Sequence, residues 1–437
     1  MEVYEILLPL ALILILSKLM GMGAQKIGLP AIIGMLLAGI LIGLVQYIPG
    51  VEEGTFIYDA FFSDEMLEGY SFLAKIGVVL IMFSAGITTD LRQIRSTGLS
   101  AVVITVLGVA VPMLFGFLVA YLFDYYTVID LINGGETGVA GEVDILSDVF
   151  YGAILTATSV SVTVAALKEL GRLNTRFGTA IIAAAVIDDI IGVVVLSVLT
   201  GLNSSNGTAG GILGSWFEPG PLFVCIKIVI FFAAALGIGF FVRKLFRWME
   251  DTYPHHRRVP IFAVAMSFLY AYLAEKLFGV ADITGAYVAG LVLSGLDETY
   301  YEEQKINSLG YMLFTPVFFA NIGISSLNLS AFGGLWLAFG ACYILAAFAG
   351  KLVGCGGGGL LCRYSLSDSL KIGLGMMVRA EVILVCAQKG IDSGLVSTDV
   401  LSYVCLIIIL SSILVPVFLK VICRHDAKKE RHISGQI

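Results

Sequence analysis

Charged side chains are scarce in this sequence. Only 14% of its 437 residues are Asp, Glu, Lys or Arg, whereas 58% are hydrophobic and the mean hydropathy is +0.95. Soluble domains typically contain about 25% charged residues and about half apolar residues. The composition therefore excludes an ordinary soluble protein and indicates an integral membrane protein that lies in a lipid bilayer.

Cysteine motifs are missing as well. The seven cysteines lie within apolar stretches or at their ends, with neither a CxxC spacing nor a Cys/His cluster. We therefore expect no disulfide, no zinc site and no resident cofactor. The first residues, "MEVYEILLPL", carry acids where a signal peptide would carry bases, so we expect the first apolar stretch to be retained.

Apolar stretches long enough to cross a bilayer recur along the whole chain. A hydrocarbon core of about 30 Å requires about 20 residues of helix. We predict an all-α polytopic membrane protein with a transmembrane domain at 1–423 and a short basic tail at 424–437. The thirteen predicted spans are 4–23, 29–47, 70–87, 98–123, 148–168, 177–199, 220–242, 259–278, 282–296, 306–325, 332–360, 369–388 and 399–421.

The Lys and Arg residues are concentrated in one set of the loops that connect these spans. With the N-terminus outside, about 20 of the 26 Lys and Arg residues fall on the cytoplasmic side, as the positive-inside rule prefers. The loop at 295–305 is cytoplasmic in this orientation, yet its net charge is negative. Asp and Glu residues contribute little to the positive-inside rule. We predict an outside N-terminus and a cytoplasmic C-terminus.

An odd number of spans permits an internal symmetry. Spans 1–6 and spans 8–13 would then be two halves of opposite membrane orientation, with span 7 as the linker. Inverted repeats of this kind are typical of secondary transporters. We therefore predict two inverted six-helix repeats.

Among the ionisable side chains inside the predicted spans, five stand out because they lie far from the span ends. Such groups are costly in a membrane, so each is a functional candidate. With a helical rise of 1.5 Å per residue, all five lie about 12 to 20 Å from the nearest cytoplasmic bases, and so near the midplane. They are Asp188, Asp189, Lys351, Arg379 and Glu381.

Two spans at this depth are poor helices. Residues 154–163 contain five Ser and Thr residues, whose hydroxyls compete with helical hydrogen bonds. In the other half, Gly373 and Gly375 directly precede the charges of span 12. Broken helices occur at membrane depth only where they line a cavity or are buried in protein, and their ends can hold ions. We predict that spans 5 and 12, which correspond under the repeat, are discontinuous.

Asp188 and Asp189 are adjacent, which has a geometric consequence. Successive residues on a helix point about 100° apart, so the two carboxyls cannot share one environment. One can face a packed partner while the other faces water. A buried ion pair that only positions helices would explain one acid and one lysine, but it leaves the second acid without a role.

The glycine-rich stretch at 354–361, "GCGGGGLL", has no Gly-Lys-Ser/Thr ending. A phosphate-binding loop requires that ending. The stretch is better explained by close helix packing or by a kink.

Several motifs, in order along nearly the whole chain, carry a family resemblance. They are "TATSVSVTVAALKELGRLNTRFGTAIIAAAVIDDIIGVVVLS", "ITGAYVAGLVLSG", "FTPVFFANIGI", "AGKLVG" and "GLGMMVRAEVILV". The sequence resembles the monovalent cation:proton antiporter family 2, in particular its NapA-type sodium/proton antiporters and the Kef-like membrane domain. The resemblance implies a homodimeric exchanger with a panel of dimerising helices and a six-helix core that moves as an elevator. Two of the core helices, spans 5 and 12, would be discontinuous and cross each other.

The same resemblance assigns roles by position. Asp189 resembles the carboxylate that binds the sodium ion or protons, and Asp188 resembles the partner of Lys351. Thr158 and Ser159 fall where the family offers oxygens to the ion. From the residues alone, any single hydroxyl in a membrane helix is more often a structural hydrogen bond than an ion ligand.

Arg379 and Glu381 match the charged stretch that the family has in span 12, and we expect them to form structural or functional ion pairs. Ala380 and Val378 stand where glycine and proline are common in the family. Residues two apart on a helix do not face each other. Each charge is therefore equally well explained by a bond to a neighbouring helix or to its free carbonyls.

These features predict a secondary sodium/proton antiporter, electrogenic and not an enzyme, in the plasma membrane of a prokaryote, with no nucleic-acid partner. A potassium/proton antiporter or potassium-efflux system is the alternative. A passive channel would favour rings of carbonyls or repeated charges, and no such repeat occurs. A prenyl transferase would require an Asp-Asp-x-x-Asp run, but its fifth position is Gly192.

Overall fold

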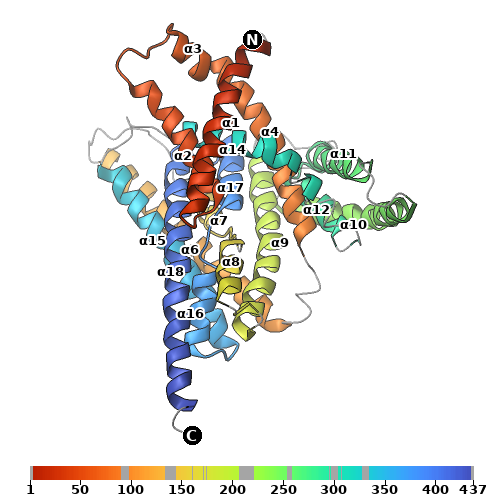
Figure 1. Cartoon of the computed structure of the whole chain (residues 1–437), viewed down its shortest axis with the longest axis vertical. Coiled ribbons are helices and arrows are strands. Elements are labelled where there is room, and N and C mark those ends of the chain that lie inside the picture. Colours follow the sequence, from red (N-terminus) through yellow and green to blue (C-terminus); the bar gives the residue numbers. More distant parts are fainter. Residues whose placement is uncertain are drawn as a thin grey trace. The chain divides into compact units, whose positions relative to one another are not determined.

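The computed structural model describes residues 3–89, 98–132, 144–159, 161–170, 172–173, 175–205, 221–252, 258–294, 296, 304–306, 308–326 and 334–434 (Figure 1). All regular secondary structure in these residues is helical. Within these described ranges, nine stretches of helix are long and apolar enough to cross a membrane. They are Tyr4–Lys26, Phe56–Thr88, Leu99–Asp124, Arg176–Asn203, Ile226–Met249, Val259–Phe278, Gln304–Ser325, Leu335–Leu361 and Val400–Cys423. The chain is thus an all-helical polytopic membrane protein.

The other four predicted spans correspond to shorter helices. The second and ninth are α2 (Ala31–Leu44) and α12 (Asp282–Leu293). Span 5 consists of α7 (Ile145–Ile154) and α8 (Ser161–Glu169), and span 12 of α16 (Leu366–Gly375) and α17 (Glu381–Asp392). Every predicted span therefore has a helical counterpart. The total of thirteen crossings and the inverted repeat stay predictions.

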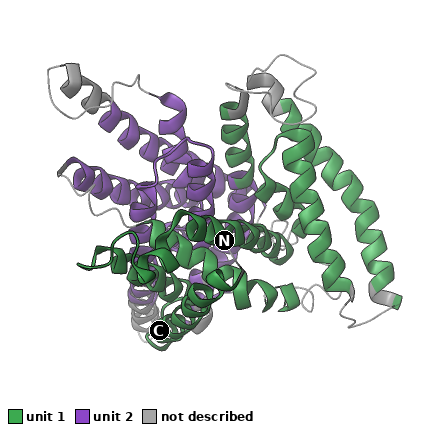
Figure 2. Ribbon diagram, turned by 90° about the horizontal axis from the view of Figure 1, so that it is seen from above, with its two compact units in different colours: residues 1–90, 193–327 green, residues 91–192, 328–437 purple. Residues whose placement is uncertain are grey.

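The chain divides into two compact units, each built from two separate segments (Figure 2). Unit 1 comprises Met1–Asp90 and Val193–Leu327, and unit 2 comprises Leu91–Gly192 and Asn328–Ile437. The division falls inside α9 (Arg176–Ser205). Each unit therefore takes helices from both halves of the chain. In the predicted numbering, unit 1 holds spans 1–3 and 7–10, and unit 2 holds spans 4–6 and 11–13.

Glycines hold the helices of unit 1 close together. Besides α2 and α12, the unit contains α1 (Val3–Lys26), α3 (Phe56–Phe62), α4 (Asp64–Thr88), α10 (Pro221–Thr252), α11 (Arg258–Leu273) and α14 (Thr315–Ser325). Gly86 and Gly290 face each other where α4 crosses α12, and Gly39 and Gly323 do so where α2 crosses α14. A Cβ on any of the four would overlap the backbone of the partner helix. Small residues are typical where membrane helices approach closely.

Unit 2 is centred on the packing of α15 (Gly334–Leu361) against α6 (Leu99–Ile132). Gly350, Gly354 and Gly358 lie one turn apart on the face of α15 that meets α6. A Cβ on Gly354 would lie 2.5 Å from the carbonyl oxygen of Leu107. The glycine-rich stretch is therefore a close-packing surface, as predicted. α18 (Val400–Ser434) packs beside α8, α15, α16 and α17 in the same unit.

Candidate functional site

Two interrupted helices cross within unit 2. The helical path stops between α7 and α8, where residues 155–159 form a turn and an extended segment, and again between α16 and α17 at residues 376–380. The backbone N–H of Ser159 donates to the carbonyl oxygen of Val378 at 2.9 Å. The hydroxyl of Thr163 donates to the carbonyl oxygen of Gly375 at 2.7 Å. Each interruption thus satisfies backbone groups that the other leaves free, which a membrane interior requires.

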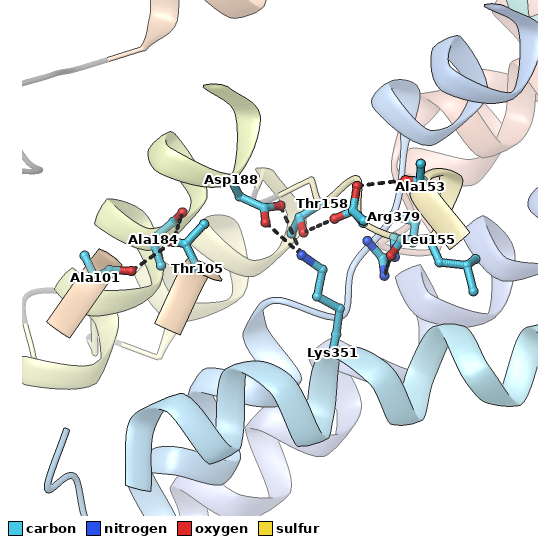
Figure 3. A network of polar contacts seen from close by, with 10 residues as sticks. Ala101, Thr105, Ala153, Leu155, Thr158, Ala184, Asp188, Lys351 and Arg379 are labelled. Atoms are coloured by element: carbon cyan, nitrogen blue, oxygen red, sulfur yellow. Dashed lines mark hydrogen bonds and ion pairs between the residues drawn. The ribbon is translucent and has the colours of Figure 1, made fainter. Parts of the chain in front are cut away.

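The predicted acid pair lies in the middle of α9. Lys351 Nζ is 2.9 Å from Oδ1 and 3.1 Å from Oδ2 of Asp188, so the ammonium binds both carboxylate oxygens (Figure 3). Lys351 is fully buried and Asp188 is 2% exposed, whereas Asp189 is partly exposed. The two adjacent acids therefore occupy different environments, as their helical geometry predicts.

A threonine that no sequence pattern singled out holds α9 in place beside this pair. The hydroxyl of Thr105, on α6, donates to the carbonyl oxygen of Ala184 at 2.8 Å (Figure 3). Ala184 lies one helical turn before Asp188. Thr105 also lies 2.9 Å from the carbonyl oxygen of Ala101 on its own helix. The only sequence signal was a hydroxyl in an otherwise apolar span, and many such hydroxyls bond only within their own helix.

Arg379 does not make the expected ion pair. Its side chain is 1% exposed, and Nη2 donates to the carbonyl oxygen of Leu155 at 2.5 Å. Its backbone N–H donates to the hydroxyl of Ser411 at 3.1 Å. Leu155 ends α7, and the last carbonyls of a helix have no partner within it and carry partial negative charge. The guanidinium therefore stabilises the end of α7, which was one of the two possibilities that the residues left open.

Glu381 also lies outside any ion pair among the described side chains, where the salt bridges are Lys351–Asp188 and Lys371–Asp368. It is the first residue of α17, and its Oε2 atom is buried with no hydrogen-bond partner there. An acid in the first helical turn is favoured by the positive N-terminal end of the helix dipole. The expected ion pairs of Arg379 and Glu381 are accordingly replaced by interactions with helix ends.

The interruption between α7 and α8, in predicted span 5, carries hydroxyl and carbonyl oxygens close to the helix crossing. Thr158 and Ser159 are 3% and 5% exposed, and the hydroxyl of Thr158 lies 3.4 Å from the carbonyl oxygen of Thr156. No group of three or more His, Cys, Asp or Glu side chains in the described residues could hold a metal ion. A cation at Asp189 would therefore depend on hydroxyl and carbonyl oxygens, the hard ligands that alkali-metal ions prefer.

The charges form one cluster around the crossing. Asp189 interacts electrostatically with Asp188, Glu381 and Lys351, and Arg379 interacts with Asp188. Because Lys351 is paired with Asp188, its positive charge mainly neutralises the carboxylate of Asp188.

Crossed interrupted helices with buried charges at the crossing define the class of secondary transporters. The fold agrees with this class. A solved structure of the sodium proton antiporter MjNhaP1 from Methanocaldococcus jannaschii superposes with a TM-score of 0.66 at 19% identity, over 96% of this chain and 97% of that one.

Residues 11–425 match the family model described as sodium/hydrogen exchanger, transmembrane, and the chain belongs to this family. It is 32% identical to the Na(+)/H(+)-K(+) antiporter GerN of Bacillus cereus, over 95% of this chain and 96% of that one. It is 30% identical to a Na(+)/H(+) antiporter of Enterococcus hirae, over 94% and 96% of the two chains. The protein is a multi-pass monovalent cation/proton antiporter and not an enzyme.

Proposed function

We propose that the protein exchanges sodium ions for protons and that Asp189 carries both ions in turn. The observation behind the proposal is the different state of two adjacent acids. Asp188 is buried in a bidentate pair with Lys351, whereas Asp189 is partly exposed beside the interrupted helices. In this state one carboxyl is paired with a lysine and its neighbour is available to an ion.

The exchange follows from competition for one carboxyl. A protonated Asp189 is neutral and has little affinity for a cation, and a cation that binds the carboxylate displaces the proton. Thr158, Ser159 and the carbonyls of the span 5 interruption would supply further oxygen ligands. Alternation of the two occupied forms across the membrane exchanges one proton for one cation at Asp189 itself.

We further propose that unit 2 moves as an elevator and that unit 1 forms a homodimer with a second copy. Both interrupted helices and the five charges that we predict near the midplane belong to unit 2. Each unit combines corresponding spans from the two halves of the chain, as an inverted repeat requires. The proposed orientation places the N-terminus outside the plasma membrane of a prokaryotic cell.

The exchange is proposed to be electrogenic. When a cation engages the two acids together, Lys351 loses its anionic partner and its own proton is released. Two protons would then move against one monovalent cation, so net charge crosses the membrane. The full burial of Lys351 supports this step because a buried ammonium without a counter-ion is unstable.

Potassium is the second candidate cation. The name of the Bacillus cereus relative includes potassium beside sodium. At about a third identity, either ion is consistent with the site described above. Potassium and sodium are therefore compared directly in the experiment.

The test is proton flux in everted membrane vesicles. Dequenching of a pH-sensitive dye after addition of NaCl, LiCl, KCl or choline chloride reports cation-driven proton movement. Wild type should respond to NaCl, and Asp189→Asn should lose the response. The matched control is Asp64→Asn, which removes an exposed carboxyl in the first turn of α4. A response of wild-type size in Asp189→Asn would refute the assigned role, and a response to KCl alone would replace sodium by potassium.

A further inference from the structure

A long segment of the chain has acids but no bases. Residues 96–167 contain no lysine or arginine. They contain six acids, namely Asp124, Asp130, Glu136, Glu142, Asp144 and Asp148. A carboxylate that becomes buried in this segment therefore has no basic side chain nearby in sequence to neutralise it.

Two of these acids meet in unit 2. Asp124 lies on α6, and Asp148 lies in the first turn of α7. The helices approach closely because Gly116 faces Gly152, where a Cβ on Gly116 would lie 2.7 Å from the Cα of Gly152. The side chains of Asp124 and Asp148 hydrogen-bond each other.

Asp148 is the buried member of this pair. It is only 1% exposed, and its Oδ2 atom has no hydrogen-bond partner among the described residues. Asp124 is exposed, so the pair is open to solvent on one side. The pair thus combines an accessible carboxyl with a buried oxygen whose bonding capacity is unused.

The charges that act on Asp148 are those of Asp124 and Asp144. Asp144 caps α7 by accepting the N–H of Leu146 at 3.0 Å. α17 also packs on α7 and carries Lys389 and Asp392 near its C-terminal end, while Asp399 precedes α18 and acts on Tyr151 of α7. The immediate electrostatic environment of Asp148 is therefore acidic.

Two carboxyl groups can hydrogen-bond only when one of them keeps its proton. Loss of that proton leaves two anions side by side, one of them with a buried oxygen, which is strongly unfavourable unless a cation replaces the proton. A proton or a cation held between the two carboxyls therefore stabilises the pair. Asp148 lies seven residues, or about 10 Å along α7, before Leu155 at the span 5 interruption, so the pair is a location separate from Asp189.

We propose that Asp124 and Asp148 form a second ion-binding site, which holds one proton and exchanges it for a hard cation such as sodium or calcium. The exposed Asp124 admits the ion, and the free Oδ2 of Asp148 binds it. The site does not depend on the role proposed for Asp189.

The test measures proton release from purified protein in weakly buffered detergent solution. The background is Asp189→Asn, which removes the proton of the first site. Addition of NaCl or CaCl2 should release at most one proton per chain, followed with a pH-indicator dye, whereas choline chloride should release none. Release by NaCl or by CaCl2 identifies the class of cation that the pair accepts.

The variants then locate the source of the proton. Asp148→Asn and Asp124→Asn, each in the Asp189→Asn background, should abolish the release, whereas Asp64→Asn in that background should leave it unchanged. Two variants on different helices guard against a loss that reflects misfolding of one of them. Release that persists in both aspartate variants, or no release with either salt before they are introduced, would overturn the proposal. Neither outcome affects the transport assay of Asp189→Asn, so the two proposals fail independently.

Discussion

Lys351 Nζ binds both carboxylate oxygens of Asp188, at 2.9 and 3.1 Å, and neither residue is accessible to solvent. Removal of one member of a buried pair typically costs about 3 to 5 kcal/mol, because it leaves an uncompensated charge. Replacement of both members by neutral residues is far less costly. The pair is therefore a thermodynamic unit, and its members should be tested together.

The first prediction is a double-variant cycle on this pair. Asp188→Asn and Lys351→Met should each lower the thermal stability of the purified protein, and the double variant should be more stable than the sum of the two losses implies. The measurement is the melting temperature in detergent. Strictly additive losses would show that the two residues do not stabilise each other.

The second prediction concerns the bond that fixes α9. Thr105→Val keeps the side-chain shape but removes the hydrogen bond to Ala184, with an expected loss of about 1 kcal/mol. The control is Thr179→Val on α9, an exposed threonine whose hydroxyl bonds only to carbonyls of its own chain segment. Thr105→Val should raise the cation concentration needed for half-maximal transport, and Thr179→Val should not. Equal effects of both variants would contradict the positioning role of Thr105.

The third prediction uses two glycines of one run. A Cβ at Gly354 would lie 2.5 Å from the carbonyl oxygen of Leu107, whereas no described atom lies within 4 Å of a Cβ at Gly357. Gly354→Ala should force α15 from α6, destabilise the protein by about 1 to 3 kcal/mol and impair transport, since Lys351 lies on the same helix. Gly357→Ala should be neutral or stabilising by up to about 1 kcal/mol, because alanine favours a helix. The measurements are the melting temperature and the vesicle transport of each variant. Equal melting temperatures and equal transport in the two variants would contradict the close packing of α15 on α6.

The sequence could predict features that depend on local chemistry. The hydroxyls at 154–163 and the glycines before Arg379 marked the two interruptions, because both weaken a helix at membrane depth. The adjacency of Asp188 and Asp189 required two environments. The partner of Asp188, however, came from a family resemblance, since helix depth alone does not show which of several charges meet.

Other features depend on tertiary contacts that no pattern encodes. Arg379 was expected in an ion pair, but its partner is the backbone carbonyl of Leu155, which every residue possesses and no side-chain pattern reveals. The contact between Thr105 and Ala184 joins residues 79 positions apart. Asp124 and Asp148 drew no attention because they fall at the ends of predicted spans, where solvated acids are common.

The last prediction concerns pH. If a proton and a cation compete for Asp189, the apparent affinity for sodium must fall as the pH falls, since acid fills the carboxyl with protons. In the acid limit, displacement of one proton raises the half-saturating sodium concentration about tenfold per pH unit, and displacement of two raises it about a hundredfold. The measurement is the half-saturating sodium concentration for dye dequenching in vesicles at a series of pH values.

The steeper dependence would require the second proton to come from Lys351, so it should revert to about tenfold per pH unit in the variant that carries both Asp188→Asn and Lys351→Met. A pH series on that variant therefore separates the number of protons exchanged from the identity of the carboxyl that binds them. A half-saturating concentration that does not change with pH in wild type would contradict competition at a single carboxyl.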